Sequence, residues 1–229
     1  MVTALVLSGG TGSRLAADVP KQYIEAGGRP IIMYCLRQLS DHDGIDKIQI
    51  VADVKWQGRI RRWLAEEGIE EKCAGFSLPG ANRQMSIHHG LEDIRRYAGE
   101  DDWVLIHDAA RPLLSAAQIT ACLDAAPGHD GVIPVLPMKD TVYLSADKKT
   151  ISALLDRSQV FAGQAPELFR LGPYYAADQR LLPDEILKIN GSTEPAVLAG
   201  MDMAMIPGDE GNFKITTRED LKAFLERLP

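Results

Sequence analysis

The 229-residue sequence predicts an α/β fold: a Rossmann-like, doubly wound, mostly parallel sheet with helices on both faces. Short apolar, β-branched runs alternate with stretches of helical periodicity, which is the order expected of parallel βαβ units. The first run ends at a group of glycines, as a buried parallel strand does at a ligand-binding edge. The length favours a single domain over residues 1–229.

The elements follow one another regularly up to Pro137. Strands are expected at residues 3–8, 47–52, 74–78, 103–107 and 131–136, and helices at 30–39, 55–65, 84–97 and 115–125. Ser115 is a suitable N-cap for its helix. Pro134 argues against a central position for the last of these strands, because proline cannot donate a ladder hydrogen bond.

The regular alternation of predicted strands and helices ends after Pro137. Residues 141–144 and 150–154 flank a polar turn and predict a β-hairpin arm at about 138–160. Such an arm has no core of its own, so a partner subunit is the expected support. Helices are expected at 167–180, 195–200 and 217–227 and a strand at 203–207, with Thr217 and Asp220 in capping-box spacing.

Composition excludes several classes of protein. A net charge of −7 argues against a protein that neutralises a nucleic-acid backbone, although a local cationic cluster can still hold a small anion. No apolar run is long enough to span a membrane, and the first residues resemble a strand rather than a signal peptide, so a cytoplasmic protein is expected. Cys35, Cys73 and Cys122 are far apart in sequence and are expected to be buried thiols.

The loop that begins at Ser8 carries the first functional signal. Its sequence, SGGTGSR, follows a predicted strand directly, and glycines there let backbone N–H groups approach an anion. The dinucleotide fingerprint fails because Leu15 stands where its third glycine belongs, and the ATPase-type loop fails because Gly-Lys-Ser/Thr is absent. Arg14 and Lys21 beside the glycines suit a triphosphate attacked at its α-phosphorus. A tight strand-to-helix turn with solvated cations is the alternative.

Five motifs then occur in order along the chain. They are LSGGTGSRL with PKQY, GANRQMSIHHGL at 80–91, HDAARP at 107–112, DR at 156–157 and NFKITT at 212–217. Together they resemble the cytidylyltransferases that make CDP-methylerythritol and CDP-ribitol. One motif would be weak evidence, but five in this order cover essentially the whole chain.

The resemblance implies roles for particular residues. It implies catalytic roles for Arg14, Lys21 and Lys214, nucleotide binding by Ser8, Gly9, Gly10, Gly12, Gly80, Ala81 and Ser86, acceptor binding by Arg111, Thr141, Arg157 and Thr193, and a Mg²⁺ ligand in Asp108. It also implies that CTP and a small polyol phosphate are the substrates and that a homodimer exchanges its arms. Taken alone, Asp108 could instead be a helix N-terminal carboxylate, and Thr141 and Arg157 could be ordinary surface residues of a hairpin. Arg83 is expected to brace its loop and His107 to be structural.

The chain departs from the family pattern where the acceptor is expected to bind. Ala165-Pro166-Glu167 replaces a Thr-Pro-Gln stretch, Thr193-Glu194 replaces a Thr-Asp pair, Gly211 replaces an acidic residue, and Tyr143 or Leu144 stands in the region of an expected lysine. The expected acceptor is 2-C-methyl-D-erythritol 4-phosphate, in isoprenoid precursor synthesis. Ribitol 5-phosphate or a related polyol phosphate is the alternative. A non-catalytic nucleotide-binding module is a further possibility from another class.

Overall fold

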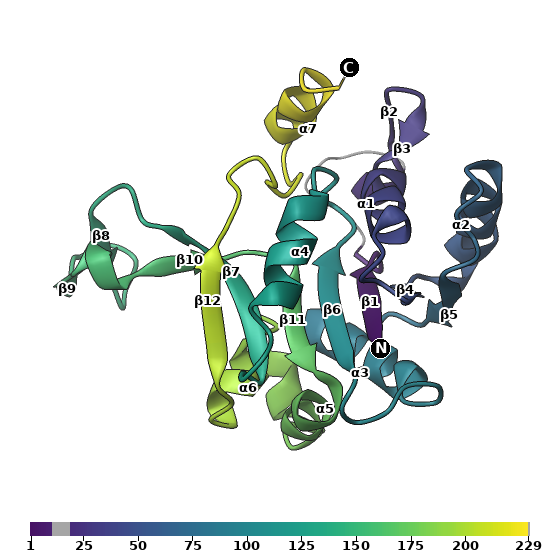
Figure 1. The fold of residues 1–229 in the computed structure, drawn as a ribbon. Coiled ribbons are helices and arrows are strands. Elements are labelled where there is room, and N and C mark those ends of the chain that lie inside the picture. Colours follow the sequence, from purple (N-terminus) through teal and green to yellow (C-terminus); the bar gives the residue numbers. More distant parts are fainter. Residues whose placement is uncertain (11–18, 229) are drawn as a thin grey trace.

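A computed structural model describes residues 1–10 and 19–228, and their centre is an eight-stranded sheet (Figure 1). Its strands are β1 (Val2–Leu7), β4 (Lys47–Val51), β5 (Cys73–Ser77), β6 (Trp103–Asp108), β7 (Gly131–Pro137), β10 (Phe161–Gly163), β11 (Glu167–Arg170) and β12 (Met203–Pro207). From β7 the sheet continues in the order β11-β6-β1-β4-β5. β10 follows β11 along the same side of β7, and β12 pairs with the other side.

The pairing confirms the predicted doubly wound, mostly parallel sheet. β1 is parallel to both β4 and β6, β4 to β5, and β12 to β7. β11 and β10 run antiparallel to their neighbours. Because the chain moves outward from β1 first on one side and then on the other, the strand order reverses between β1 and β6, and open α/β sheets bind ligands at such a point.

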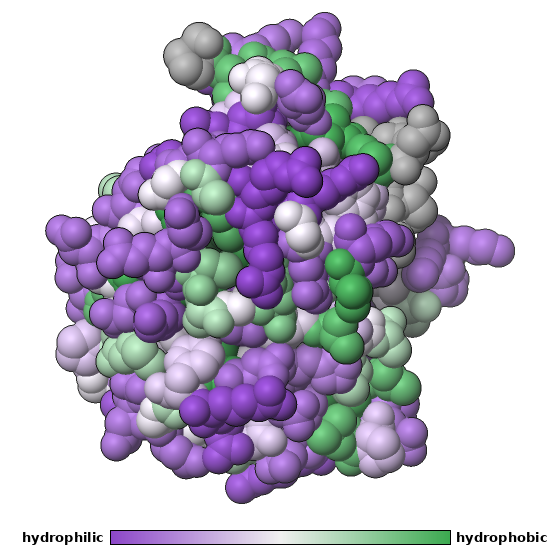
Figure 2. All heavy atoms as spheres, turned by 90° about the vertical axis from the view of Figure 1, so that its right-hand side faces the viewer, coloured by the Kyte–Doolittle hydropathy of each residue, from purple (hydrophilic) through white to green (hydrophobic). Residues whose placement is uncertain are grey.

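Helices cover both faces of the sheet in two layers (Figure 1). One face carries α1 (Ile31–Asp41), α2 (Val54–Glu66) and α4 (Ala116–Asp124), and the other carries α3 (Arg83–Ile94), α5 (Leu171–Gln179) and α6 (Glu194–Leu198). Strand side chains alternate between the two cores: Ala4 and Val6 belong to the first and Leu5 to the second. The face seen in Figure 2 is mostly hydrophilic, with apolar side chains in small groups.

Local sequence signals fix where several helices begin. Asn82 and Ser115 accept hydrogen bonds from backbone N–H groups of α3 and α4, as N-cap residues do. Thr217 and Asp220 form the predicted capping box of α7 (Arg218–Leu225), which packs against α1 through a small core of its own. The cysteines are free thiols, and Cys35 and Cys122 are buried.

One predicted element is wrong in part. A helix was expected over residues 167–180, but only Leu171–Gln179 is helical, and Glu167–Arg170 forms β11 between β6 and β7. Leu168 and Phe169 are fully buried there, one on each face of the sheet. Burial between two existing strands outweighs the weak local preference of these residues. β10 was not predicted at all.

Pro134 does lie within β7, and the register explains how it is tolerated. On one side of β7, β11 pairs with residues 131–132 and β10 with residues 135–137, so Pro134 falls between the two strands. Its missing N–H therefore interrupts no ladder on that side.

The predicted arm projects from the sheet (Figure 1). It consists of the antiparallel pair β8 (Val142–Leu144) and β9 (Ala153–Leu155), followed by a 3₁₀ turn at Arg157–Gln159. The remaining short elements are η2 (Lys21–Tyr23), β2 (Glu25–Ala26), β3 (Arg29–Pro30) and η4 (Glu185–Lys188). Among the described residues, none of the helices is both long and apolar enough to cross a membrane.

Candidate active site

A cavity of about 610 Å³ opens at the carboxyl ends of β1, β5 and β6, where the strand order reverses. Loops after these three strands and the segment before α7 supply its walls. The lining residues are Leu7, Gly9, Gly10, Lys21, Gln22, Gly80, Ala81, Asn82, Arg83, Ser86, Asp108, Ala110, Lys214 and Thr216. The cavity therefore brings together eight of the residues predicted from the sequence, from four separate motifs.

The loop after β1 is held from beneath by side chains of η2. Gln22 donates from its amide nitrogen to the carbonyl oxygens of Ser8 and, at 2.8 Å, Gly10. The hydroxyl of Tyr23 donates to the same Ser8 carbonyl at 3.0 Å. The Ser8 hydroxyl itself points away from the cavity and donates to the carbonyl of Val51 at 2.6 Å. Ser8 thus shapes the loop from below, while Gly9 and Gly10 face the cavity.

Two glycines in the cavity wall are required by close contacts. A Cβ on Gly9 would lie 2.5 Å from the Cβ of Pro79, so the loops after β1 and β5 can meet only at a glycine. A Cβ on Gly80 would lie 2.3 Å from the Cβ of Met85. Both positions hold bare backbone against the cavity, which suits recognition of a ligand through main-chain groups.

The loop after β5 is tied to the start of α3. The Gly80 N–H donates to the Ser86 hydroxyl at 2.9 Å, and that hydroxyl donates to the Asn82 carbonyl at 2.8 Å. Asn82 caps α3 through its side-chain oxygen. These bonds fix Gly80 and Ala81 at the cavity without using a charged group.

Asp108 is the carboxylate of the cavity, and three cations surround it. Arg83 Nε lies 3.2 Å from Oδ1, while Lys214 Nζ and Arg111 Nε lie 3.0 Å and 3.6 Å from Oδ2. Burial raises the pKa of Asp108, but the positive charges of Arg83, Lys214 and Arg111 outweigh it and hold the pKa well below its usual range. The group is therefore ionised. The alternative role, a carboxylate that binds the amides of a helix N-terminus, does not describe these contacts.

Two further titratable residues near Asp108, His107 and Glu167, are buried. Burial lowers the pKa of His107 to about 4, so the ring is neutral, and its Nε2 donates to the Arg111 carbonyl at 3.0 Å. This agrees with the structural role expected for His107. Burial raises the pKa of Glu167 to about 7, against the opposing charges of Arg83 and Arg111. The Ser192 hydroxyl donates to the Glu167 carboxylate.

Several predicted residues lie away from the cavity wall. Arg111 donates from Nη1 to the Asn212 carbonyl at 2.7 Å and contacts Asp108 from the side. Thr141 and Arg157 are exposed on or beside the arm, where Arg157 donates to the Lys139 carbonyl at 2.8 Å. Thr193 is the residue just before α6, and its hydroxyl oxygen is buried without a hydrogen-bond partner among the described residues. Gly12 and Arg14 lie outside the described residues.

Some residues of the cavity had no role in the sequence-based predictions. Gln22, Asn82 and Thr216 line the cavity although only their neighbours were singled out. Gln22 stands in the PKQY motif, so the motif itself contained its signal. Glu167 was recognised only as a departure from a family pattern, and its burial beside the site follows from β11, the strand that was predicted as a helix.

Comparison with known proteins agrees with this geometry. The model of the 2-C-methyl-D-erythritol 4-phosphate cytidylyltransferase family matches residues 2–226. The chain belongs to this family. Cytidylyltransferases are nucleotidyltransferases, so the family places the chain among enzymes of that kind.

Individual relatives cover nearly the whole chain. A 2-C-methyl-D-erythritol 4-phosphate cytidylyltransferase of Rubrobacter xylanophilus is 37% identical over 95% of this chain and 90% of its own length. A ribitol-5-phosphate cytidylyltransferase of Lacticaseibacillus paracasei is 26% identical over 98% of this chain and 96% of its own length. The crystal structure of 4-diphosphocytidyl-2C-methyl-D-erythritol synthase from Anaerococcus prevotii superposes with a TM-score of 0.83 at 25% identity, covering 99% and 96% of the two chains.

Proposed function

We propose that this protein transfers a cytidylyl group from CTP to 2-C-methyl-D-erythritol 4-phosphate and releases pyrophosphate. The observation that carries the proposal is a cavity in which two glycine-bearing loops, Lys21, Lys214 and the ionised Asp108 face one another. The family match over residues 2–226 supports the same reaction. Because CTP is a cytoplasmic metabolite, we place this reaction in the cytoplasm.

The proposed reaction is an in-line displacement at the α-phosphorus of CTP. An oxygen of the acceptor's phosphate forms the new P–O bond. The bond from the α-phosphorus to the bridging oxygen of pyrophosphate breaks, and pyrophosphate leaves with that electron pair. Lys21 and Lys214 stabilise the negative charge on the α-phosphate and the leaving group, and Arg14 adds a third cation. Positioning and electrostatics carry chemistry of this kind, so no covalent enzyme intermediate is required.

The donor set at Asp108 fits a Mg²⁺ ion. The carboxylate is ionised and faces the cavity, and Mg²⁺ takes one or two protein carboxylates with phosphates and water as its other ligands. Residues 1–10 and 19–228 contain no group of three His, Cys, Asp or Glu that could hold a metal, and a site completed by phosphates needs none. We propose that Asp108 would hold Mg²⁺ together with the phosphates of CTP, and that the bound ion would supply positive charge against the phosphates.

The second candidate acceptor is ribitol 5-phosphate or a related polyol phosphate. A buried Ala165 stands where many relatives carry a threonine hydroxyl, so one acceptor contact of the family pattern is absent. The relative from Lacticaseibacillus paracasei is named for ribitol 5-phosphate, but it is less similar to this chain than the one from Rubrobacter xylanophilus. The first acceptor is therefore favoured.

We also propose that two copies of the chain exchange their arms. Tyr143, Leu144, Ile151, Leu154 and Leu155 are exposed apolar side chains of the arm, and a second subunit would cover them. In this arrangement, Thr141 and Arg157 contact the acceptor in the partner's cavity. Arg157 suits that role because guanidinium groups bind phosphate through two parallel hydrogen bonds.

The proposal is tested by incubating the purified protein with CTP, Mg²⁺ and a panel of polyol phosphates while pyrophosphate is measured. We expect release with 2-C-methyl-D-erythritol 4-phosphate, slower release with ribitol 5-phosphate, and none after Mg²⁺ is removed with EDTA. If the protein binds CTP but releases pyrophosphate with none of the acceptors, the proposed enzymatic activity is contradicted and a non-catalytic nucleotide-binding module is favoured.

A further inference from the structure

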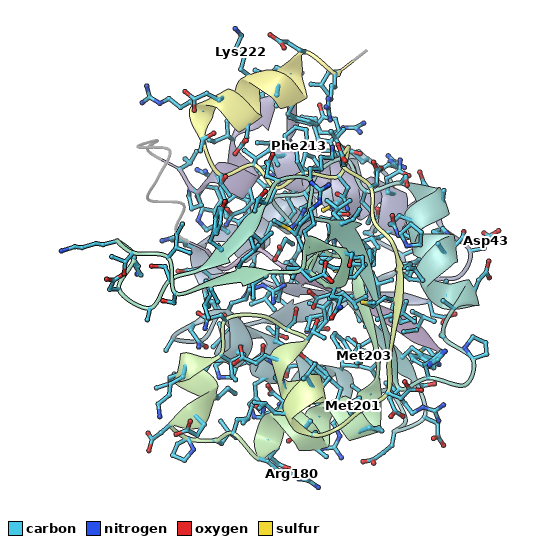
Figure 3. The ribbon with its side chains drawn as sticks, turned by 90° about the vertical axis from the view of Figure 1, so that its left-hand side faces the viewer. Asp43, Arg180, Met201, Met203, Phe213 and Lys222 are labelled. Carbon is cyan, nitrogen blue, oxygen red and sulfur yellow. The ribbon has the colours of Figure 1, made fainter. Side chains whose placement is uncertain are left out.

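The segment that carries Lys214 has no regular structure of its own. Residues 208–217 form neither strand nor helix, and they connect β12 to α7. Figure 3 shows this course, from Met203 on the strand up to Phe213 below the helix that bears Lys222. The position of Lys214 therefore depends on bonds that other parts of the chain make with this segment.

Gln164 makes the central bonds. It is 5% exposed and follows β10 directly, and its own N–H is bonded to the Pro134 carbonyl at 2.8 Å, which fixes it to the sheet. Its side-chain oxygen accepts from the Asp209 N–H at 3.0 Å, and its side-chain nitrogen donates to the Asp209 carbonyl at 2.8 Å. The same nitrogen lies 3.3 Å from the Asn212 carbonyl. The amide thus pairs with the segment in both directions, as a neighbouring strand would.

Asn212 returns the contact. It is fully buried, and its side-chain nitrogen donates to the Ala165 carbonyl at 2.8 Å. Its own carbonyl accepts from Arg111 at 2.7 Å. Beyond it, the Ile215 N–H donates to the Ala110 carbonyl at 2.8 Å. Lys214 is therefore held between two fixed points, and the first of them depends on residues 164 and 165.

Other contacts of the segment are weaker candidates for this task. Lys139 forms an ion pair with Glu210, but both side chains are more than half exposed, and exposed ion pairs contribute little. The Arg227 guanidinium lies over the Phe213 ring, 4.9 Å from its centroid, but Arg227 follows α7 and is not part of the sheet. The Gly208 N–H donates to the Val135 carbonyl of β7 at 2.9 Å, at the start of the segment. The buried amide of Gln164 joins residues closer to Lys214, namely Asp209 and Asn212, to the sheet.

We propose that Gln164 is a positioning residue of the active site: by pairing with Asp209 and Asn212 it holds Lys214 beside Asp108. This inference rests on the proposed function only in assigning Lys214 to the reaction. Gln164 itself does not line the cavity and is not expected to touch substrate.

The test replaces Gln164 by leucine, which keeps the volume and removes every side-chain hydrogen bond. We expect kcat to fall by about a hundredfold, the scale of a displacement of about 1 Å in a reacting group. The KM for CTP should stay the same, because the loops that carry Gly9 and Gly80 do not contact Gln164. Gln49→Leu is the matched control: Gln49 is equally buried and bonded to Ser77 in β5, and this variant should keep the kcat of the unaltered protein.

A double variant separates positioning from general damage. Gln164→Leu should slow the Lys214→Ala protein no further, because the group that it positions is already absent. An equal slowing in both backgrounds, or an unchanged kcat in Gln164→Leu alone, would overturn the proposal. If Gln164→Leu is unfolded at the assay temperature, Asn212→Ala carries the same comparison.

A second readout does not depend on turnover. Hydrogen exchange at the amides of Asp209, Asn212 and Ile215 should be faster in Gln164→Leu than in the unaltered protein and in Gln49→Leu. If the unaltered protein releases no pyrophosphate, the proposed function fails, but faster exchange in Gln164→Leu still shows that Gln164 holds the segment in place. Unchanged exchange at these amides would overturn this role of Gln164, whatever the activity.

Discussion

The two halves of the cavity present different kinds of chemical group. The half formed by the loops after β1 and β5 presents backbone groups of Gly9, Gly10 and Gly80, braced by neutral side chains. The half around β6 and β11 presents ionised side chains, with Asp108 at its centre. Under the proposed function, the first half binds the nucleotide and is called the nucleotide half. The second half binds the reacting phosphates and the acceptor and is called the acceptor half.

The difference shows where variation is tolerated. In the nucleotide half, a side chain added at Gly9 or Gly80 would collide with a neighbouring loop, so its sequence is tightly limited. Two of the departures from the family pattern, Ala165 and Glu167, are buried beside the acceptor half, before and at the start of β11. Four substitutions test whether the two halves act separately.

Lys21→Ala is expected to have the largest effect. Loss of one fixed cation at the α-phosphate should lower kcat by roughly a hundredfold to a thousandfold. Steady-state release of pyrophosphate measures it, with the exposed Lys55→Ala as a control that should behave normally. Near-normal turnover in Lys21→Ala would remove Lys21 from the proposed chemistry.

Gly80→Ala should damage the nucleotide half selectively. The added Cβ would lie 2.3 Å from Met85, so the loop must shift, and the KM for CTP should rise by roughly ten- to a hundredfold. The KM for the acceptor should hardly change. Gly58→Ala, where a Cβ meets open space, is the control. An equal rise in both KM values would mean that the two halves are not separate.

Glu167→Gln tests the ionisation of the Glu167 carboxyl group, which is buried beside the acceptor half. Burial raises the pKa of Glu167 from 4.5 to about 7, so the folded protein holds a proton that the unfolded chain releases between these values. The stability of the unaltered protein therefore falls as pH rises through this window, and the loss is complete above pH 7. Glutamine does not titrate, and its side-chain oxygen can still accept a hydrogen bond from the Ser192 hydroxyl.

We expect Glu167→Gln to be more stable than the unaltered protein by on the order of 2 kcal/mol at pH 8, and by much less at pH 5. Urea unfolding at the two pH values measures this difference. Glu226→Gln, at an exposed glutamate, is the control. A stability difference that is the same at both pH values would contradict the ionisation assigned to Glu167.

Arg157→Ala should have the smallest of the four effects and act on the acceptor alone. Loss of one guanidinium–phosphate contact should raise the acceptor KM by about tenfold while the KM for CTP stays unchanged. Arg180→Ala, at an exposed residue directly after α5, is the control. A matching rise in the KM for CTP would show that the arm does not serve the acceptor.

The nucleotide half could be predicted from the sequence because its signals are local. The glycine loop after the first strand and the start of the motif at residues 80–91 each occupy a few adjacent residues. The acceptor half could not be predicted to the same degree. Asp108 and Lys214 are 106 residues apart, and Gln164 meets Asp209 across 45 residues. No local pattern contains such contacts.

A competition assay asks whether the protein transfers a cytidylyl group from CTP and whether the acceptor half selects the acceptor. Limiting CTP is offered with equal amounts of 2-C-methyl-D-erythritol 4-phosphate and ribitol 5-phosphate, and the CDP-linked products are quantified by mass spectrometry. We expect CDP-methylerythritol to predominate in the unaltered protein, and the ratio to stay the same in Gly80→Ala while total product falls. A predominance of CDP-ribitol would contradict the proposed acceptor, and no CDP-linked product would contradict the reaction itself.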